Sequence, residues 1–450
     1  MKLAAAAIAS GRVAFRGPDA QLNGARIPAY PAYGAPRWLR TERPVALGEL
    51  VAASSLQGMG LRPGALSVQF RAAPDLFFWP RDGGHLDLDY RYPQADWMDK
   101  RASRMDVSLN GQFQRSLPLA RASWWQSLFG NSAASSLTGD ARVTLPRYDL
   151  YGQNELVFDY NMVLADKQEC SGTLPENVRT AVLPTSRIDL TDAYHALRMP
   201  DLASFANAGY PFTIHPDLAR TAVVLGRAPT AETIRAFLVL MGRLGDATGA
   251  PATRVRVLAE GNERQLDGLD VIVLGDTQLA EGNPLFADAP VSGSGGRLSV
   301  VQGSPVTRAF DGYTPFADQQ GEAAEFVSTL DGFQGIVGFK SPYGDNRSVV
   351  AILADDPALL PLLVQNMADL QINAQIGGDL SVFNGEGMSS YAVGPTYWSG
   401  SLPLWVRIAY WFSQYPLLLA AGGLLIAVLV AGPLLLVLRR RAARRLGDDA

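Results

Sequence analysis

The sequence predicts a multidomain fold: a β-sandwich, then an α/β domain, an amphipathic helix and one C-terminal transmembrane helix. Three observations carry this prediction. Apolar and polar residues alternate over the first half, apolar strands alternate with helical stretches over the second, and a long uncharged segment lies near the C-terminus. With 450 residues, 48% of them hydrophobic, the chain is long enough for two folded domains and an anchor.

The β-sandwich is predicted by short strand-like runs. From about Val45 to Leu190 the sequence alternates with period two between Gly, Pro, Asp and Asn, as in ALSVQFRAA, HLDLDYRYP, ARVTLPRYDL and NELVFDYNMVLA. Asn110-Gly111 is typical of a two-residue hairpin turn. We therefore predict a β-sandwich or jelly roll over residues 35–194. The segment 1–34 precedes it as an N-terminal extension, which we expect to be truncated because MKLAAAAIAS is too short and too weakly apolar for a signal peptide.

The α/β domain is predicted over residues 217–396, after a linker at 195–216. TAVVLG is a short apolar strand, and Thr230 can cap a helix that ends at Gly249. RVRVLA, LDVIVLG, RLSVV, GIVGFK and SVVAILA are strand-like, and ADDPALLPLLVQNMADLQ is a second helix with Pro357 in its first turn. This alternation favours a largely parallel sheet.

The transmembrane helix is predicted from Leu417 to Leu438, a 22-residue stretch without a charged side chain. As a helix it is about 33 Å long, enough to cross a bilayer core. Five arginines in the tail 439–450 place that end in the cytoplasm and the bulk of the chain on the outer side of the membrane. They are Arg439, Arg440, Arg441, Arg444 and Arg445.

An amphipathic helix is predicted just before the span, within residues 397–416. Its apolar residues recur at spacings of three and four and form one face: Leu404, Trp405, Ile408, Trp411, Phe412 and Tyr415. Tryptophan and tyrosine prefer the headgroup layer, so we expect the helix to lie on the outer leaflet. It could instead pack on the soluble domain, and the same face could dock a membrane partner.

No catalytic, cofactor or metal constellation is found in the sequence. The turn LGRAPTAET lacks a phosphate-binding pattern, SGSGG at 292–296 precedes a strand, and the histidines His85, His195 and His215 are isolated. Asp87 and Asp89 share one strand face, which favours a solvated surface over a hydrolytic carboxylate pair. The net charge of −4 gives no sign of a nucleic-acid surface, and the lone cysteine, Cys170, excludes an intrachain disulfide.

Aromatic residues of the first domain are candidates for sugar contact, since exposed rings can stack on sugar faces. Plugging the ends of the sandwich or meeting the next domain is the structural alternative. The cluster comprises Trp38, Phe77, Phe78, Trp79, Trp97, Trp124 and Trp125, of which Trp79, Trp97, Trp124 and Trp125 are the candidate sugar contacts.

The order of these parts resembles the B subunit of bacterial cellulose synthase. The stretches that carry the resemblance are APRWLRTERPVALGEL (35–50), PDLFFWPRDG (74–83), RMPDLASFANAGYPFT (198–213), SPYGDNRSVVAILADDP (341–357) and YWSGSLPLWVRIAYWFSQYPLLL (397–419). Family members usually carry two pairs of a carbohydrate-binding-like jelly roll and a flavodoxin-like domain. This chain has one pair, so it resembles their C-terminal half.

The resemblance implies a non-catalytic periplasmic subunit without a cofactor. Its anchor and amphipathic helix would pack on the membrane glucosyltransferase that makes β-1,4-glucan from UDP-glucose, and its soluble domains would guide the nascent glucan. The family is also labelled cyclic di-GMP-binding. The known sensor pattern for this dinucleotide begins with an RxxxR pair. Arg440 and Arg444 match that first half by spacing only, and no second half follows, so we expect the dinucleotide to act through the catalytic subunit. Direct binding of cyclic di-GMP and an exported polysaccharide hydrolase are the alternative functions.

Overall fold

The computed structural model describes residues 2–9, 13–16, 19–22, 26–79, 83–93, 97–119, 136–150, 152–165, 178–301, 319–414, 422–424 and 427–438. It divides into unit 1, Met1–Phe78 with Asp82–Gly400, and unit 2, Trp79–Arg81 with Ser401–Ala450. Several residues named above lie outside the described part: Trp124, Trp125, Cys170, Tyr415, Arg439, Arg440, Arg441, Arg444 and Arg445. Only the backbone is described for Trp411 and Phe412.

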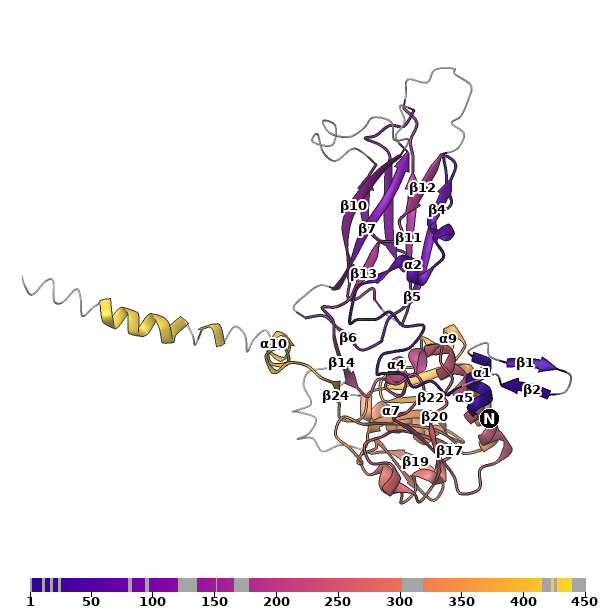
Figure 1. The fold of residues 1–450 in the computed structure, drawn as a ribbon. Coiled ribbons are helices and arrows are strands. Elements are labelled where there is room, and N and C mark those ends of the chain that lie inside the picture. Colours follow the sequence, from indigo (N-terminus) through magenta and orange to yellow (C-terminus); the bar gives the residue numbers. More distant parts are fainter. Residues whose placement is uncertain are drawn as a thin grey trace, which may run out of the picture. The chain divides into compact units, whose positions relative to one another are not determined.

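The first part of unit 1 is the predicted β-sandwich, the purple strands in Figure 1. One antiparallel sheet has the order β3-β13-β7-β12-β4, with β10 also paired to β7: Val45–Ala46, Arg187–Asp189, Gly83–Pro93, Arg179–Val182, Gln57–Met59 and Ser136–Pro146. The other has the order β5-β11-β8-β9: Leu66–Arg71, Gln153–Asn161, Arg104–Leu109 and Gln112–Pro118. Between β3 and β4 lie α2 (Leu47–Leu50) and the 3-10 helix Ala53–Leu56.

The period-two alternation produces the sandwich core. On β5 the residues Leu66, Val68 and Phe70 are buried while the residues between them face solvent. They join buried residues of both sheets in one apolar cluster, which is what closes a sandwich. The predicted turn is confirmed, since Asn110 has a φ of 51° and Gly111 a φ of 78°, the left-handed pair of a type I′ hairpin.

The stretch predicted as a linker is folded. Residues 195–216 include most of β14 (Tyr194–Met199), α4 (Leu202–Ala208) and the 3-10 helix Phe212–Ile214. β14 is the centre of a three-stranded sheet, flanked by β24 (Tyr397–Gly400) and β6 (Leu76–Phe77). The side chains of Phe205, Tyr210 and Phe212 are buried. Apolar burial therefore fixes this connection within unit 1.

A seven-stranded sheet of order β16-β15-β17-β21-β20-β22-β23 forms the α/β part: Arg256–Ala259, Thr221–Leu225, Asp270–Asp276, Ser348–Ala354, Gln334–Lys340, Leu380–Phe383 and Met388–Tyr391. The first four strands are parallel, as predicted, and the other three are antiparallel. The prediction of a largely parallel sheet is wrong for those three. The connections 341–347 and 384–387 are too short for a parallel crossover, which needs a dozen or more residues.

Both faces of this sheet are covered, as the buried strands require. Along β17, Val271 and Val273 belong to one apolar cluster, whereas Ile272 and Leu274 belong to the cluster on the opposite face. The long helix α5 (Ala231–Thr248) covers the second cluster together with α8 (Leu360–Asn366). The predicted cap is confirmed, because the Thr230 hydroxyl accepts a hydrogen bond from the Thr233 amide at 3.2 Å.

One local prediction in this part is wrong. The second helix is broken into the 3-10 helix Pro357–Leu359, α8 and α9 (Leu370–Asn373), because the Asp369 carboxylate accepts the amides of Gln371 and Ile372 and starts a new turn. The strand predicted at RLSVV is confirmed as β19 (Arg297–Val300), although it pairs with β18 (Val291–Ser294) outside the main sheet. α7 (Gln319–Thr329) follows on the chain.

The N-terminal extension contains α1 (Lys2–Ala9) and a hairpin of β1 (Val13–Arg16) and β2 (Asp19–Leu22). The Lys2 ammonium donates to the Val255 carbonyl at 3.3 Å, so this segment belongs to unit 1.

Unit 2 contains α10 (Leu404–Gln414), which begins later than the predicted segment 397–416 because residues 397–400 form β24. The predicted span 417–438 is described only at 422–424 and 427–438, where the backbone is helical. Within the described part of the chain, no helix has both the length and the apolar character needed to cross a membrane.

Candidate functional site

Helix α10 presents an uncovered apolar face. Leu404 is 72% exposed, Trp405 57% and Ile408 55%. These three residues fall on one side of the helix, because positions one and four residues apart lie within about 100° of each other on a 3.6-residue helix. A large aromatic and two aliphatic side chains in water cost free energy unless another apolar surface covers them. We call Leu404, Trp405 and Ile408 the apolar face of α10.

The opposite side of α10 holds the residues that are covered. Val406 is fully buried, and Tyr410 is half-buried with its ring meeting the ring of Trp79 edge-on, at 5.9 Å between centroids and 82° between planes. Trp79 and Tyr410 both belong to unit 2. Val406 and Tyr410 are therefore the residues of the helix that pack within the chain, and the apolar face of α10 remains exposed.

The aromatic residues proposed as glucan contacts differ in their surroundings. Trp79 takes part in the ring contact with Tyr410, and Trp97 is half-buried against the sandwich core. Trp38 is 5% exposed, and its indole N–H donates to the Ala247 carbonyl at 3.0 Å. The structural alternative thus accounts for Trp38 and fits Trp97. Sequence reasoning missed Tyr148, which is 78% exposed in the turn after β10, under the Arg147 guanidinium at 4.6 Å.

The acidic pair on β7 is part of a charged strand surface. An oxygen of Asp87 lies 2.7 Å from Arg142 Nε on the neighbouring strand β10, and both side chains are exposed. Asp89 accepts a hydrogen bond from the Thr185 hydroxyl at 3.2 Å. Paired carboxylates that share a face and already hold cross-strand partners behave as a solvated surface rather than as an acid and a base on two sides of a bond.

One polar cluster escaped the sequence analysis, which treated His195 as isolated. Asp75 is fully buried, and its two carboxylate oxygens lie 3.0 Å from His195 Nδ1 and 2.5 Å from the Tyr33 hydroxyl. His195 Nε2 lies 2.9 Å from the Thr41 hydroxyl. Three segments far apart in the sequence supply these groups, the first holding Tyr33 and Thr41, the second Asp75 and the third His195, so no local motif reveals them.

The order hydroxyl, imidazole, carboxylate is that of a hydrolytic triad. Here the second carboxylate oxygen is taken by Tyr33, and the Tyr33 ring stacks on the imidazole with 3.6 Å between centroids. Burial, and then the charge of Asp75, raise the pKa of Tyr33 well above its usual range, so its phenol stays a donor to Asp75. The cluster thereby joins the N-terminal segment, the sandwich and β14 by satisfied buried hydrogen bonds.

The glycine-rich run has its turn amides engaged by a carboxylate of the chain itself. The glycine-rich run 292–296 ends in the turn between β18 and β19, and the amides of Gly295 and Gly296 donate to the Glu281 carboxylate at 3.2 and 3.4 Å. A small cavity of about 10 Å³ lies beside the end of β16, with Leu258, Ala259 and Leu285 in its lining. No group of three metal-ligating side chains occurs among the residues that the structure describes.

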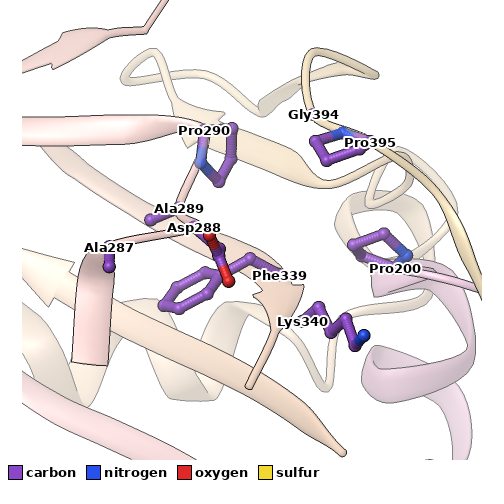
Figure 2. Close-up of a pocket in the computed structure, with 10 residues that line it drawn as sticks. Pro200, Ala287, Asp288, Ala289, Pro290, Phe339, Lys340, Gly394 and Pro395 are labelled. Atoms are coloured by element: carbon purple, nitrogen blue, oxygen red, sulfur yellow. The ribbon is translucent and has the colours of Figure 1, made fainter. Parts of the chain in front are cut away.

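A cavity of about 300 Å³ opens beside the end of β20. Figure 2 shows the rings of Pro200, Pro290 and Pro395 around it, with the Asp288 side chain reaching toward Phe339. Lys340 is the other charged residue of the lining. The lining therefore combines three proline rings with one carboxylate and one ammonium, and it contains none of the candidate residues predicted from the sequence.

Comparison with protein families finds two consecutive matches. Residues 44–187 match the model for "Cellulose synthase BcsB, second CBM domain", which covers most of the sandwich. Residues 195–352 match "Cellulose synthase BcsB, second FD domain", which covers β14 and much of the α/β part.

Relatives of known name agree with these matches. The cyclic di-GMP-binding protein of Escherichia coli (strain K12) is 34% identical over 93% of this chain and 54% of its own length. The cyclic di-GMP-binding protein of Komagataeibacter xylinus is 33% identical over 87% of this chain and 50% of its own length. Cellulose synthase 2 of Novacetimonas hansenii is 35% identical over 87% of this chain and 25% of its own length. The chain thus spans about half the length of the first two.

Proposed function

Because the chain belongs to the BcsB family of cellulose synthase subunits, we propose that it is a non-catalytic, membrane-anchored subunit that supports a glucan synthase. Its partner would be the membrane-embedded catalytic subunit that makes β-1,4-glucan from UDP-glucose. In this proposal the sandwich and the α/β part, jelly-roll-like and flavodoxin-like in their family, guide the extruded glucan on the periplasmic side.

The observation that carries the proposal is the apolar face of α10. Leu404, Trp405 and Ile408 are exposed although the same helix buries Val406. A tryptophan flanked by aliphatic side chains suits the headgroup layer of a membrane, or a helix of a membrane partner next to that layer. Both surfaces would be present around a membrane-embedded synthase.

The anchor completes the proposed topology. Residues 417–438 would cross the inner membrane, and the arginines of 439–450 would hold the C-terminus in the cytoplasm. The bulk of the chain would then lie in the periplasm. We assign no chemical step to this subunit, since Asp87 is engaged by Arg142 and Asp75 by Tyr33 and His195.

Co-expression with the catalytic subunit tests the proposal. The full chain should be recovered with its partner from detergent-solubilised membranes, whereas a chain ending at Gly400 should not. A chain ending at Gly400 that is recovered as well as the full chain would contradict the role of α10 and the span. Protease added to spheroplasts should digest the first 400 residues, and protection of this region would contradict the topology.

Direct binding of cyclic di-GMP is the second candidate, favoured by the name of the Escherichia coli and Komagataeibacter xylinus relatives. Arg440 and Arg444, which share the spacing of the sensor pattern, lie outside the described residues. Calorimetric titration of the detergent-solubilised full chain with cyclic di-GMP decides between the two. Heat of binding at micromolar ligand, lost in Arg440→Ala, would support the second candidate, and its absence at high micromolar ligand would dismiss it.

A further inference from the structure

A second cavity of about 310 Å³ lies at the amino ends of the parallel strands. Its lining includes Arg220, Asp270 and Arg347, which stand directly before β15, at the start of β17 and directly before β21. This is the sheet edge opposite the one where α/β folds hold their cofactors. Nothing in the proposed function uses this cavity, and its volume is at the lower end for small-ligand pockets.

Part of the cavity wall is apolar and rigid. Phe212 and Pro211 are buried, and Ile214 is half-buried beside them. The Phe212 ring packs edge-on against Phe205, with 5.5 Å between centroids, so its position is fixed by the core behind it. Because Phe212 is only 2% exposed, the apolar side chains that a ligand would meet are the half-buried Ala32 and Ile214.

The charged groups of the cavity are of two kinds. Arg347 Nη1 lies 2.9 Å from one oxygen of the buried Asp270 carboxylate, whose other oxygen accepts the Ser348 amide at 2.9 Å. This pair is fixed in place. By contrast, the exposed side chains of Arg220, Asp345 and Asn346 make no hydrogen bond or salt bridge within the described part of the chain. They offer donors and acceptors to a ligand.

The charge balance selects the ligand class. Two arginines, Arg220 and Arg347, stand against two aspartates, Asp270 and Asp345, so the lining has no net charge apart from His215. A phosphate or another anion would gain from the arginines and lose to the aspartates. A neutral molecule that carries several hydroxyl groups would bind both the arginines and the aspartates, since each hydroxyl donates one hydrogen bond and accepts two.

We propose that this cavity binds one neutral pyranose unit of a glucan. The C–H face of the sugar ring lies against Ala32 and Ile214, and its hydroxyls meet Arg220, Asp345 and Asn346. The inference rests on the proposed function only for the choice of a β-1,4-glucan as the probe. It gives the α/β part its own point of contact with the polymer.

Titration of the detergent-solubilised full chain with cellotetraose tests this site, with maltotetraose and inorganic phosphate as comparison ligands. Arg220→Ala removes a donor from an exposed side chain, and Asn346→Gly removes an amide while keeping the backbone, because Asn346 has a φ of 57° that glycine tolerates. Each variant should raise the Kd of cellotetraose at least tenfold. Arg256→Ala, at an exposed arginine on the edge strand β16, is the matched control and should leave the Kd unchanged.

Three results would overturn the site: no binding of cellotetraose at millimolar concentration, an equal Kd in wild type and both variants, or tighter binding of phosphate than of cellotetraose. Recovery of the catalytic partner, measured in the same variants, separates this inference from the proposed function. If the chain is recovered with its catalytic partner but binds no sugar, only the pyranose site would be contradicted. If the full chain binds the sugar in a manner that depends on Arg220 but is never recovered with the catalytic partner, only the proposed subunit role would be contradicted.

Discussion

The ring of Tyr33 lies on the imidazole of His195, with 3.6 Å between centroids and 23° between planes. The same tyrosine donates its hydroxyl to Asp75, whose other carboxylate oxygen meets His195 Nδ1. Tyr33, which precedes the sandwich in the sequence, and His195, which follows it, therefore both contact the buried carboxylate of Asp75. His195 lies on β14, which pairs with β24 (Figure 1).

Removal of this carboxylate should destabilise unit 1. Asp75→Ala leaves the Tyr33 hydroxyl and the His195 imidazole without their acceptor in a buried site, which costs about 2–4 kcal/mol of unfolding free energy. Urea unfolding of the detergent-solubilised chain, followed by tryptophan fluorescence, measures the change. The control is Asp246→Ala, which removes an exposed ion pair with Arg37 and should cost less than about 1 kcal/mol. Equal midpoints for Asp75→Ala and the wild type would contradict the structural role of the cluster.

Asp379 should make stability depend on pH. Its carboxylate is buried and accepts the amides of Val393 and Gly394, and burial raises its pKa from 3.8 to about 6. The folded chain therefore keeps a proton that the unfolded chain loses. The resulting stabilisation is complete below pH 3.8 and is lost as the pH rises through 6, for a total of roughly 2–3 kcal/mol.

Asp379→Asn removes this titration while nearly preserving the shape of the side chain. The unfolding free energy of the wild type should fall relative to that of Asp379→Asn between pH 4 and pH 7, as read from urea midpoints at each pH. All other carboxylates titrate in both proteins and cancel in the difference. Parallel curves across this range would show that Asp379 keeps its ordinary pKa.

A charge on the apolar face of α10 should prevent assembly. Trp405→Glu places a carboxylate where the proposal puts lipid or a membrane partner, so recovery of the catalytic subunit should fall more than tenfold. Leu370→Glu is the matched control, because Leu370 is an apolar residue with 86% exposure on α9 in the α/β part. Recovery that stays unchanged in Trp405→Glu, or that falls equally in Leu370→Glu, would contradict the role of this face.

The carboxylate of Asp87 should be dispensable. Asp87→Asn weakens an exposed ion pair with Arg142, which solvent screens so that it contributes little to stability, and it removes no chemical step. Partner recovery and glucan synthesis in membranes should equal those of the wild type. Release of reducing sugar from glucans by the wild type, lost in Asp87→Asn, would instead revive the hydrolase alternative.

The sequence predicted those elements whose cause is local. Thr230 caps α5 through its own hydroxyl, Asn110-Gly111 sets a hairpin turn by backbone preference, and the alternation on β5 sorts its side chains between core and solvent. Each depends on residues within a few positions of one another. Such signals survive in any tertiary context that buries the same face.

The remaining features depend on chain segments that only folding brings together. Asp75 and His195 are 120 positions apart, and nothing near either residue marks the other as its partner. Arg220, Asp270 and Arg347 form one cavity because parallel strands start at the same edge, which requires the strand order to be known. The direction of β20 could have been derived from the short connection 341–347, but its apolar run alone does not distinguish parallel from antiparallel.

The central claim is that this subunit supports synthesis through its membrane segment and carries out no chemistry itself. Incorporation of radiolabelled glucose from UDP-glucose into insoluble glucan, by the catalytic subunit reconstituted with this chain, tests it most directly. We predict that the full chain sustains incorporation and that a chain ending at Gly400 reduces it at least tenfold. Incorporation that is the same with the full chain, the shortened chain and no added chain would contradict the account.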